Sequence, residues 1–282
     1  MARRQQGIHK RPNPWLVALG SIAVVVFFGF PYALMFVTSL KTRLEVTEIP
    51  PVYFPATPQW SNYISVWSSE VNPASSLLST VVIASGATLL VLVVATPAAY
   101  YVARFRFPGR LSFLLLVLVT QMLQPTVLAV GLYQEFRGWQ GYAVWGALIL
   151  INGAFNLSFA IWIMQAFFAS VPKEIEEAAL IDGLGRLQTM FRISLPLVWP
   201  GIVTAVVFVF VNAWNEYAAA LILVQTPDLQ PLTVSMPRFL GLYIQDWQYL
   251  FAVALIAVVP VIILFGFIEK RLIGGLTAGA GK

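Results

Sequence analysis

The side chains that could perform chemistry in this chain are few, and most of them stand alone. The sequence has no cysteine and a single histidine, His9, which lies in a basic N-terminal segment. Nucleophile–base pairs and zinc sites both need such residues in groups. The one carboxylate inside a long apolar segment is Glu216. We therefore expect no enzyme active site, no metal site and no cofactor bound by this chain.

Carboxylates gather once, in the polar segment 170–197, which separates two apolar stretches. Its glutamates favour the start of a helix, because carboxylates complement the positive end of the helix dipole. Ile175, Ala178, Ala179 and Asp182 recur at helical spacing and are expected to share one face. The two small alanines on that face would permit another surface to approach closely. The pattern predicts a helical hairpin that docks a soluble partner. The residues of this predicted docking site are Glu176, Glu177, Ala178, Ala179, Asp182, Gly183, Ile193, Leu195 and Pro196.

A hairpin of this kind could instead lie on the lipid headgroups. The cytoplasmic leaflet is negatively charged and attracts basic segments. A negative surface would repel the four carboxylates of the segment, which are Glu174, Glu176, Glu177 and Asp182. The sequence therefore favours a protein partner over a lipid surface.

A second group of polar residues lies inside apolar segments. Asn212, Asn215 and Glu216 are three and four residues apart, so a continuous helix would place them on one face. Gln121 and Gln124 lie close to a proline in another apolar segment. Polar groups at such depth usually face a bundle interior or a water-filled cavity. They either line a path for a hydroxylated substrate or join helices through hydrogen bonds, and both interpretations stay open.

The composition places these residues in a membrane protein. Of the 282 residues, 59% are hydrophobic and only 10% are charged, whereas soluble domains carry about 25% charged residues. A backbone that crosses lipid must satisfy its hydrogen bonds internally, so we predict an all-α integral membrane protein. The net charge of +5 does not indicate nucleic acid, because the basic residues lie in short loops.

Six apolar segments are long enough to cross a hydrocarbon core of about 30 Å as helices. The six predicted spans are 15–37, 77–102, 111–133, 142–168, 198–224 and 249–268. Together they form one transmembrane domain over residues 15–268. Residues 1–14 and 269–282 are then the N-terminal and C-terminal tails.

The distribution of basic residues predicts the orientation. Thirteen lysines and arginines fall in the two tails and in the segments after the second and fourth spans, whereas the opposite segments hold only Lys41, Arg43, Arg137 and Arg238. Cytoplasmic loops carry the excess of positive charge, so both termini and the hairpin are predicted to be cytoplasmic. Two long outer segments, 38–76 and 227–248, are either interfacial anchors or a docking face for an external protein.

The hairpin also carries a family signature. Glu177-Ala178-Ala179 is followed after three residues by Gly183, after nine more by Ile193, and after one more by Leu195-Pro196. This spacing resembles the EAA signature of the membrane subunits of ATP-binding cassette (ABC) importers in every fixed position. The resemblance implies that the hairpin is a coupling helix seated in a groove of a cytoplasmic ATPase. Leu184 departs from the family, which more often has a small residue there.

Other segments resemble the carbohydrate-uptake branch of that family. They are Ala98-Ala99-Tyr100, residues 103–110, residues 214–217 and the tail at 275–280. The tail resembles that of the maltose-transporter G-type subunit, in which it reaches the interface between two ATPase subunits. The resemblance implies the same place for Gly275, Leu276 and Thr277.

The resemblance implies a permease subunit of a binding-protein-dependent importer for an oligosaccharide or disaccharide, in a bacterial or archaeal plasma (inner) membrane. Its partners would be a second homologous permease subunit, two ABC ATPase subunits that bind ATP and Mg, an extracytoplasmic solute-binding protein, the sugar and the lipid bilayer. The chain would form part of the translocation path and transmit ATPase motion through the hairpin. The resemblance to the maltose system implies that the partner membrane subunit carries most of the sugar contacts.

Two other functions stay open. The same importer could carry glycerol phosphate or another polyol, although a phosphate would favour an arginine or lysine inside the spans, and the sequence has none there. A self-sufficient secondary transporter would need ion ligands in broken helices and usually an inverted repeat. Glu216 is a single intramembrane carboxylate, and no clear repeat is visible.

Overall fold

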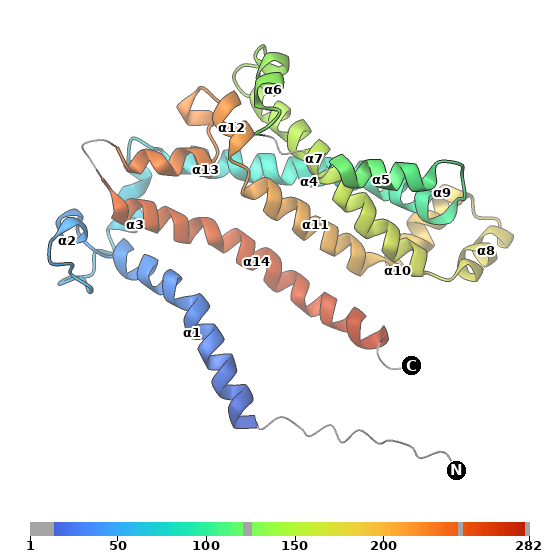
Figure 1. The fold of residues 1–282 in the computed structure, drawn as a ribbon, viewed down its shortest axis with the longest axis horizontal. Helices are drawn as coiled ribbons and strands as arrows, with labels where there is room; N and C mark the ends of the chain where they lie inside the picture. The colour runs from blue at the N-terminus through green and yellow to red at the C-terminus, as the bar shows by residue number, and fades with distance from the viewer. Residues whose placement is uncertain (1–13, 121–125, 242–244, 280–282) are drawn as a thin grey trace.

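The structure is a computed structural model that describes residues 14–120, 126–241 and 245–279. Long helices dominate this part of the chain (Figure 1). Apart from one isolated bridge between Leu240 and Gln245, the described residues contain no β-structure. The prediction of an all-α protein is confirmed.

The longest described helices form the body of the fold. They are α1 (Pro14–Ser39), α4 (Pro73–Arg104), α7 (Ala143–Ser170), α11 (Trp199–Trp214) and α14 (Trp247–Gly279). The shorter helices are α2 (Arg43–Thr47), α3 (Asn62–Ser65), α5 (Arg110–Thr120), α6 (Ala129–Phe136), α8 (Lys173–Ile181), α9 (Arg186–Thr189), α10 (Leu195–Leu197), α12 (Ala218–Leu223) and α13 (Leu232–Ser235). Single turns of 3₁₀ or π type are η1 (Val66–Ser68), η2 (Met190–Ser194), η3 (Pro227–Leu229) and η4 (Met236–Phe239).

Four described helices are long and apolar enough to cross a membrane: Trp15–Ser39, Pro73–Arg104, Ala143–Ser170 and Trp247–Gly266. They coincide with the first, second, fourth and sixth predicted spans. A fifth candidate is the pair Arg186–Leu197 and Trp199–Trp214, whose two parts are bent by 81°. Length and composition in the structure therefore support four spans, or five with the bent pair.

The fifth predicted span, 198–224, is not the continuous helix that we expected. Helix α11 ends at Trp214 and α12 begins at Ala218. The cause is local, because the Glu216 carboxylate accepts hydrogen bonds from the backbone N–H groups of Ala219 and Ala220. A side chain that satisfies the first N–H groups of a helix defines a helix start and interrupts the preceding run.

Two other predicted spans also differ from the structure. In the region of the third, 111–133, helix α5 has 11 residues and helix α6 has 8, whereas a spanning helix needs about 17 or more. Residues 121–125, between them, lie outside the described residues. Helix α14 continues to Gly279, so the predicted tail 269–282 begins as a continuation of the sixth span.

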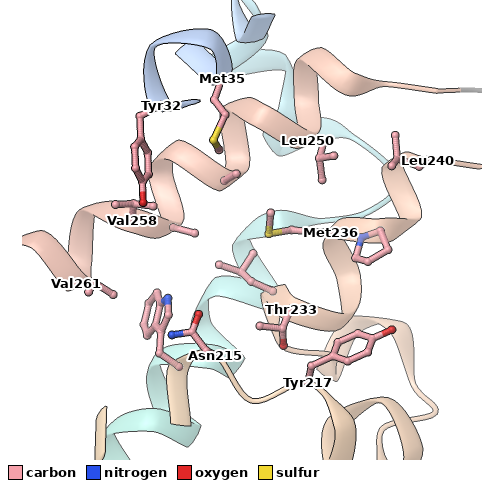
Figure 2. Close-up of a pocket in the computed structure, with 15 residues that line it drawn as sticks. Tyr32, Met35, Asn215, Tyr217, Thr233, Met236, Leu240, Leu250, Val258 and Val261 are labelled. Carbon is pink, nitrogen blue, oxygen red and sulfur yellow. The ribbon is translucent and has the colours of Figure 1, made fainter. Parts of the chain in front are cut away.

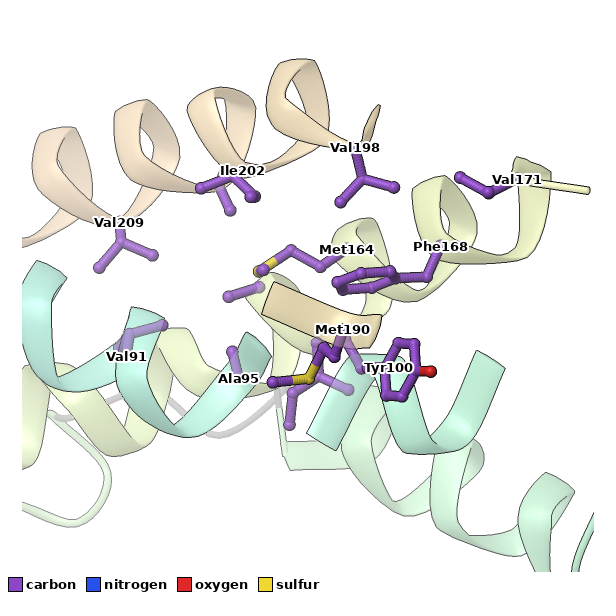
Figure 3. Close-up of a cluster of buried hydrophobic side chains, with 14 residues drawn as sticks. Val91, Ala95, Tyr100, Met164, Phe168, Val171, Met190, Val198, Ile202 and Val209 are labelled. Atoms are coloured by element: carbon purple, nitrogen blue, oxygen red, sulfur yellow. The ribbon is translucent and has the colours of Figure 1, made fainter. Parts of the chain in front are cut away.

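The packed centre of the molecule consists of α4, α7 and α11. Small residues permit the close approach: a Cβ atom added at Gly201 of α11 would lie 2.7 Å from Cβ of Phe167 on α7. One buried cluster joins the three helices and includes Val91, Tyr100, Phe168 and Val209 (Figure 3). The hairpin that contains α8 and α9 lies at one end of α4, and α3 and α13 lie toward the other end (Figure 1).

Candidate functional site

The predicted docking hairpin is present and begins with helix α8, which ends in a tight turn at Gly183. The Gly183 N–H donates to the carbonyl of Leu180 and the Leu184 N–H donates to the carbonyl of Ala179, each at 3.1 Å. These two bonds form a Schellman motif, which requires a left-handed residue at the position after the cap. Gly183 has φ of +88°, and this left-handed conformation explains why the position is a glycine.

The return arm consists of α9, the π turn η2 and α10. The side-chain oxygen of Gln188 accepts a hydrogen bond from the Gly185 N–H at 3.1 Å and holds the start of α9. Pro196 lies in the first turn of α10, where a missing N–H is tolerated. The arm then joins α11 through the 81° bend.

One face of α8 is exposed along its whole length. Glu174, Glu177, Ala178 and Ile181 follow the i, i+3, i+4, i+7 pattern of a helical stripe, and all four are exposed. Ile181 is 86% exposed, and Leu187 on the return arm is 68% exposed. We call Glu174, Glu177, Ala178, Ile181 and Leu187 the docking stripe. Apolar side chains bordered by carboxylates form a surface suited to a protein partner.

Two of the residues predicted for docking point inward and do not belong to the exposed surface of α8. Glu176 is 7% exposed and Ala179 is 6% exposed. Residues three apart on a helix share a face, so both lie on the side of α8 opposite the docking stripe. The two alanines of the signature therefore do not share a docking face.

The other predicted docking residues divide by exposure. The exposed ones are Glu177, Ala178, Asp182, Gly183 and Pro196. Ile193 and Leu195 are half-buried, and Leu195 packs against the cluster that joins α4, α7 and α11. The hairpin thus has one exposed surface and one that packs against the long helices.

The buried face of α8 is held by a network around the Glu176 carboxylate. The Tyr100 hydroxyl donates to Oε2 at 3.1 Å, and Arg104 Nε donates to Oε1 at 2.9 Å. Arg104 Nη2 also lies 2.8 Å from Oε1, and the Ser194 hydroxyl donates to the same oxygen. Arg104 Nη1 donates to the carbonyl of Val171 at 3.0 Å. One carboxylate therefore connects α4, α8 and η2.

Tyr100, Arg104 and Ser194 are functional candidates that the sequence alone did not identify. In the sequence, Arg104 counts as a topological charge after the second span and falls in the family-like segment 103–110, and neither observation gives it a contact. A usable signal was its place in the last turn of a long apolar helix, where a cation is favourable and lies close to the next polar segment. The pairing with Glu176 could not be read from spacing, because the two residues are 72 positions apart.

The candidate substrate-path residues lie at the break between α11 and α12. The side-chain amides of Asn212 and Asn215 each donate at 2.8 Å to a carbonyl of the preceding helical turn. The Glu216 carboxylate caps α12, with 2.7 Å to the N–H of Ala219. Its backbone carbonyl accepts a hydrogen bond from the Thr233 hydroxyl at 2.6 Å. The three residues therefore do not share one continuous helical face.

A cavity of about 680 Å³ opens beside this break. Asn215, Tyr217 and Thr233 line one side, and Tyr32 and Met35 of α1 lie on another (Figure 2). Most of the remaining lining is apolar and comes from α13, η4 and α14. Asn212 does not line this cavity, and the predicted path residues Gln121 and Gln124 lie outside the described residues.

The predicted tail residues lie at the end of α14. Gly275, Leu276 and Thr277 belong to the backbone of this helix, in the stretch from residue 267 whose side chains lie outside the described part. Within the described ranges, the structure has no group of three or more His, Cys, Asp or Glu side chains that could hold a metal ion.

Comparison with known proteins gives consistent matches over most of the chain. The model of one family, described as the binding-protein-dependent transport system inner membrane component, matches residues 95–276. The sulfoquinovosyl glycerol transport system permease protein of Agrobacterium fabrum is 33% identical over 254 residues, which cover 90% of this chain and 88% of that protein. The diacetylchitobiose uptake system permease protein of Streptomyces coelicolor is 31% identical over 265 residues, which cover 92% and 95%.

Among solved structures, the fold is similar to that of a bacterial ABC transporter involved in the import of the acidic polysaccharide alginate. The TM-score is 0.74 at 22% identity, and the match covers 90% of this chain and 94% of that chain. At this identity the likeness concerns the fold. The family match includes the hairpin, Tyr100, Arg104 and the break between α11 and α12.

Proposed function

The chain belongs to the family of binding-protein-dependent transport system inner membrane components, and from this premise we propose that it imports a sugar. It is an inner-membrane permease subunit of an ABC importer and not an enzyme. The resemblance drawn from the hairpin signature is confirmed. We infer its cargo, its topology and its partners from its relatives and from its own residues.

A sugar cargo is supported by the relatives. The two similar permeases are named for sulfoquinovosyl glycerol and for diacetylchitobiose, and the solved transporter is titled for alginate. All three names denote compounds that contain sugar units. We propose an oligosaccharide or disaccharide as the cargo.

We propose six spans with both termini in the cytoplasm. The third span would comprise α5 and the residues that follow it, and the fifth would comprise α11 and α12 with the break between them. The distribution of basic residues supports the orientation, because Arg104, Lys173, Arg186 and Arg192 all lie at or near the hairpin. The hairpin is then cytoplasmic, and α13 faces the outer side.

We propose that the docking stripe seats an ABC ATPase subunit. The single observation that carries this proposal is the exposure of Glu177, Ala178 and Ile181 along one face of α8. The full assembly would contain a second permease subunit, two ATPase subunits that bind ATP and Mg, and an extracytoplasmic solute-binding protein. Gly275, Leu276 and Thr277 would reach the interface between the ATPase subunits.

We propose that the sugar passes the break between α11 and α12. Asn215, Tyr217 and Thr233 supply an amide and two hydroxyl groups to a cavity that is otherwise mostly apolar. Such a combination fixes the orientation of a small ligand with few polar groups. We also propose that the same path passes Asn212, Glu216, Gln121 and Gln124. Glu216 would shape the path by fixing the start of α12, whose first N–H groups it binds.

A pull-down of the tagged chain from a detergent extract tests the docking proposal. We expect an ATPase to co-purify with the wild-type chain, measured as ATP hydrolysis in the eluate. Glu177→Arg should lose it, because a charge reversal on the docking stripe opposes the partner. Asp228→Arg, which reverses an exposed carboxylate in η3, is the matched control and should retain it. A wild-type chain that purifies without an ATPase would refute the docking proposal.

A further inference from the structure

Glu176 occupies a position that docking does not explain. It lies on the face of α8 opposite the docking stripe, yet it is a charged residue with 7% exposure. We propose that Glu176 is a positioning residue that locks the hairpin to the end of α4, so that both move as one body when the ATPase moves. This inference rests on the proposed function, in which the ATPase docks on the hairpin.

The contacts of Glu176 fit a lock and not a docking surface. The side chains of Glu176 and Arg104 are 9% and 7% exposed, with Arg104 Nη2 at 2.8 Å from Oε1. A pair shielded from water interacts more strongly than an exposed pair and is little screened by salt. Tyr100 and Ser194 donate to the same carboxylate, so hydrogen bonds satisfy both of its oxygens. Buried charges are retained where they are paired in this way.

Apolar side chains pack around the ion pair and add to the contact between the hairpin and the long helices. The Tyr100 ring meets the Phe168 ring edge-on, with 5.4 Å between the centroids. Met190 of η2 is fully buried in the same cluster (Figure 3). Helices α4 and α7 and the return arm of the hairpin therefore share one core at this point. Interdigitated cores resist deformation, so a displacement of the hairpin is passed to its neighbours.

Helix α4 is placed to carry that displacement across the molecule. It has 32 residues and is therefore about 48 Å long at a rise of about 1.5 Å per residue. Near its far end, the Thr80 hydroxyl accepts a hydrogen bond from the Leu232 N–H at 2.8 Å. Leu232 and Thr233 of α13 line the cavity beside the α11–α12 break. One helix thus connects the locked hairpin to the wall of the cavity.

The chain connection alone would not give this coupling. Helix α8 follows α7 directly, and the return arm leads into α11, but α4 is separated from Glu176 by about seventy residues of sequence. The contacts of Tyr100 and Arg104 bring α4 and α8 together in space. Arg186, whose guanidinium carbon lies 4.8 Å from the centre of the Phe105 ring, adds a contact just beyond the end of α4.

The test uses the complete importer, purified with its ATPase and binding protein and reconstituted in proteoliposomes. The quantity measured is sugar transported per ATP hydrolysed. We expect Glu176→Gln and Arg104→Gln each to lower this ratio about tenfold, which lies within the range for coupling between sites. The charge swap Glu176→Arg with Arg104→Glu should recover part of the loss, because it restores an ion pair.

Met164→Leu is the control for a merely structural role, because Met164 is an uncharged member of the same buried cluster. It should lower the yield of complex without changing the ratio. An unchanged ratio in Glu176→Gln would overturn the inference while leaving the proposed function intact. A wild-type complex that transports sugar without hydrolysing ATP would instead refute the proposed function.

A second measurement does not depend on variants of the lock. The chain has no cysteine, so spin labels can be placed as pairs at Lys173→Cys and Val93→Cys, and at Lys173→Cys and Val25→Cys. All three positions are exposed. Between the nucleotide-free and ATP-bound complexes, the distance from 173 to 93 on α4 should stay constant while the distance from 173 to 25 on α1 changes. A change in the 173–93 distance as large as the other would overturn the inference.

Discussion

The carboxylates of Glu176 and Glu216 both stabilise the chain, but Glu176 does so through residues far away in the sequence and Glu216 through neighbouring ones. Glu176 pairs with Arg104, which lies 72 positions away, and with Tyr100, 76 positions away. Glu216 accepts from backbone N–H groups only three and four positions away. The first joins separate elements, and the second defines where one short helix begins. A carboxylate in an apolar chain therefore has to be judged by its partners and not by its depth.

The hairpin, which contains Glu176, and the α11–α12 break, which contains Glu216, differ in the same way. In the hairpin, the Glu176–Arg104 pair lies on one face of α8 and an exposed stripe on the other, as the proposed docking and coupling roles require. At the α11–α12 break, the polar side chains mostly satisfy the local backbone, and among them Asn215, Tyr217 and Thr233 line the cavity.

The largest expected effect is that of Glu176→Ala. It leaves the Arg104 guanidinium buried without its counter-ion, which costs about 3–5 kcal/mol in the free energy of unfolding. Denaturant unfolding of the purified subunit in detergent measures the change. Glu174→Ala removes an exposed carboxylate from the same helix and should stay within about 0.5 kcal/mol of wild type. Equal losses for the two would remove the distinction between the faces of α8.

A smaller effect is expected for Glu216→Ala. It removes the capping acceptor of α12, and loss of a helix cap costs about 1 kcal/mol. The same unfolding measurement applies, with Asp228→Ala as a matched control because that carboxylate lies exposed in η3. A loss as large as that of Glu176→Ala would show that Glu216 also makes a long-range tie.

The smallest expected effect is the coupling energy between Glu216 and Thr233. Thr233 donates to the backbone carbonyl of Glu216 and not to its carboxylate. The unfolding energies of Glu216→Ala and Thr233→Val should therefore add in the double variant within about 0.5 kcal/mol. The cycle of Glu176→Gln with Arg104→Gln should instead show coupling of about 1–3 kcal/mol, as for residues in contact. Equal coupling in both cycles would erase the difference between local and long-range carboxylates.

Much of the hairpin could be predicted from sequence because its signals are local. Gly183 marks a turn whose left-handed backbone favours glycine, and the carboxylates mark a helix start. The orientation of α8 about its axis could not be predicted. Helical spacing fixes which residues share a face but not which face is buried, and that depended on Arg104 and Tyr100 from a distant segment.

In the fifth predicted span, the feature that could not be predicted was local: a break in the helix. The apolar run from residue 198 to 224 suggests one helix, on which the adjacent polar residues Asn215 and Glu216 would form a polar face. An acidic residue followed shortly by small apolar residues is also typical of a helix start. Periodicity could not separate these interpretations, because both place polar residues at the same positions.

Site-directed cross-linking tests most directly whether the exposed face of α8 binds the ATPase. The absence of native cysteine means that Ala178→Cys is the only reactive thiol in its chain. In membranes that contain the assembled importer, a short bifunctional reagent should link residue 178 to an ATPase subunit, whereas Asp228→Cys should give no such product. Failure of Ala178→Cys to link an ATPase, or equal linking from both positions, would contradict the docking role of the hairpin.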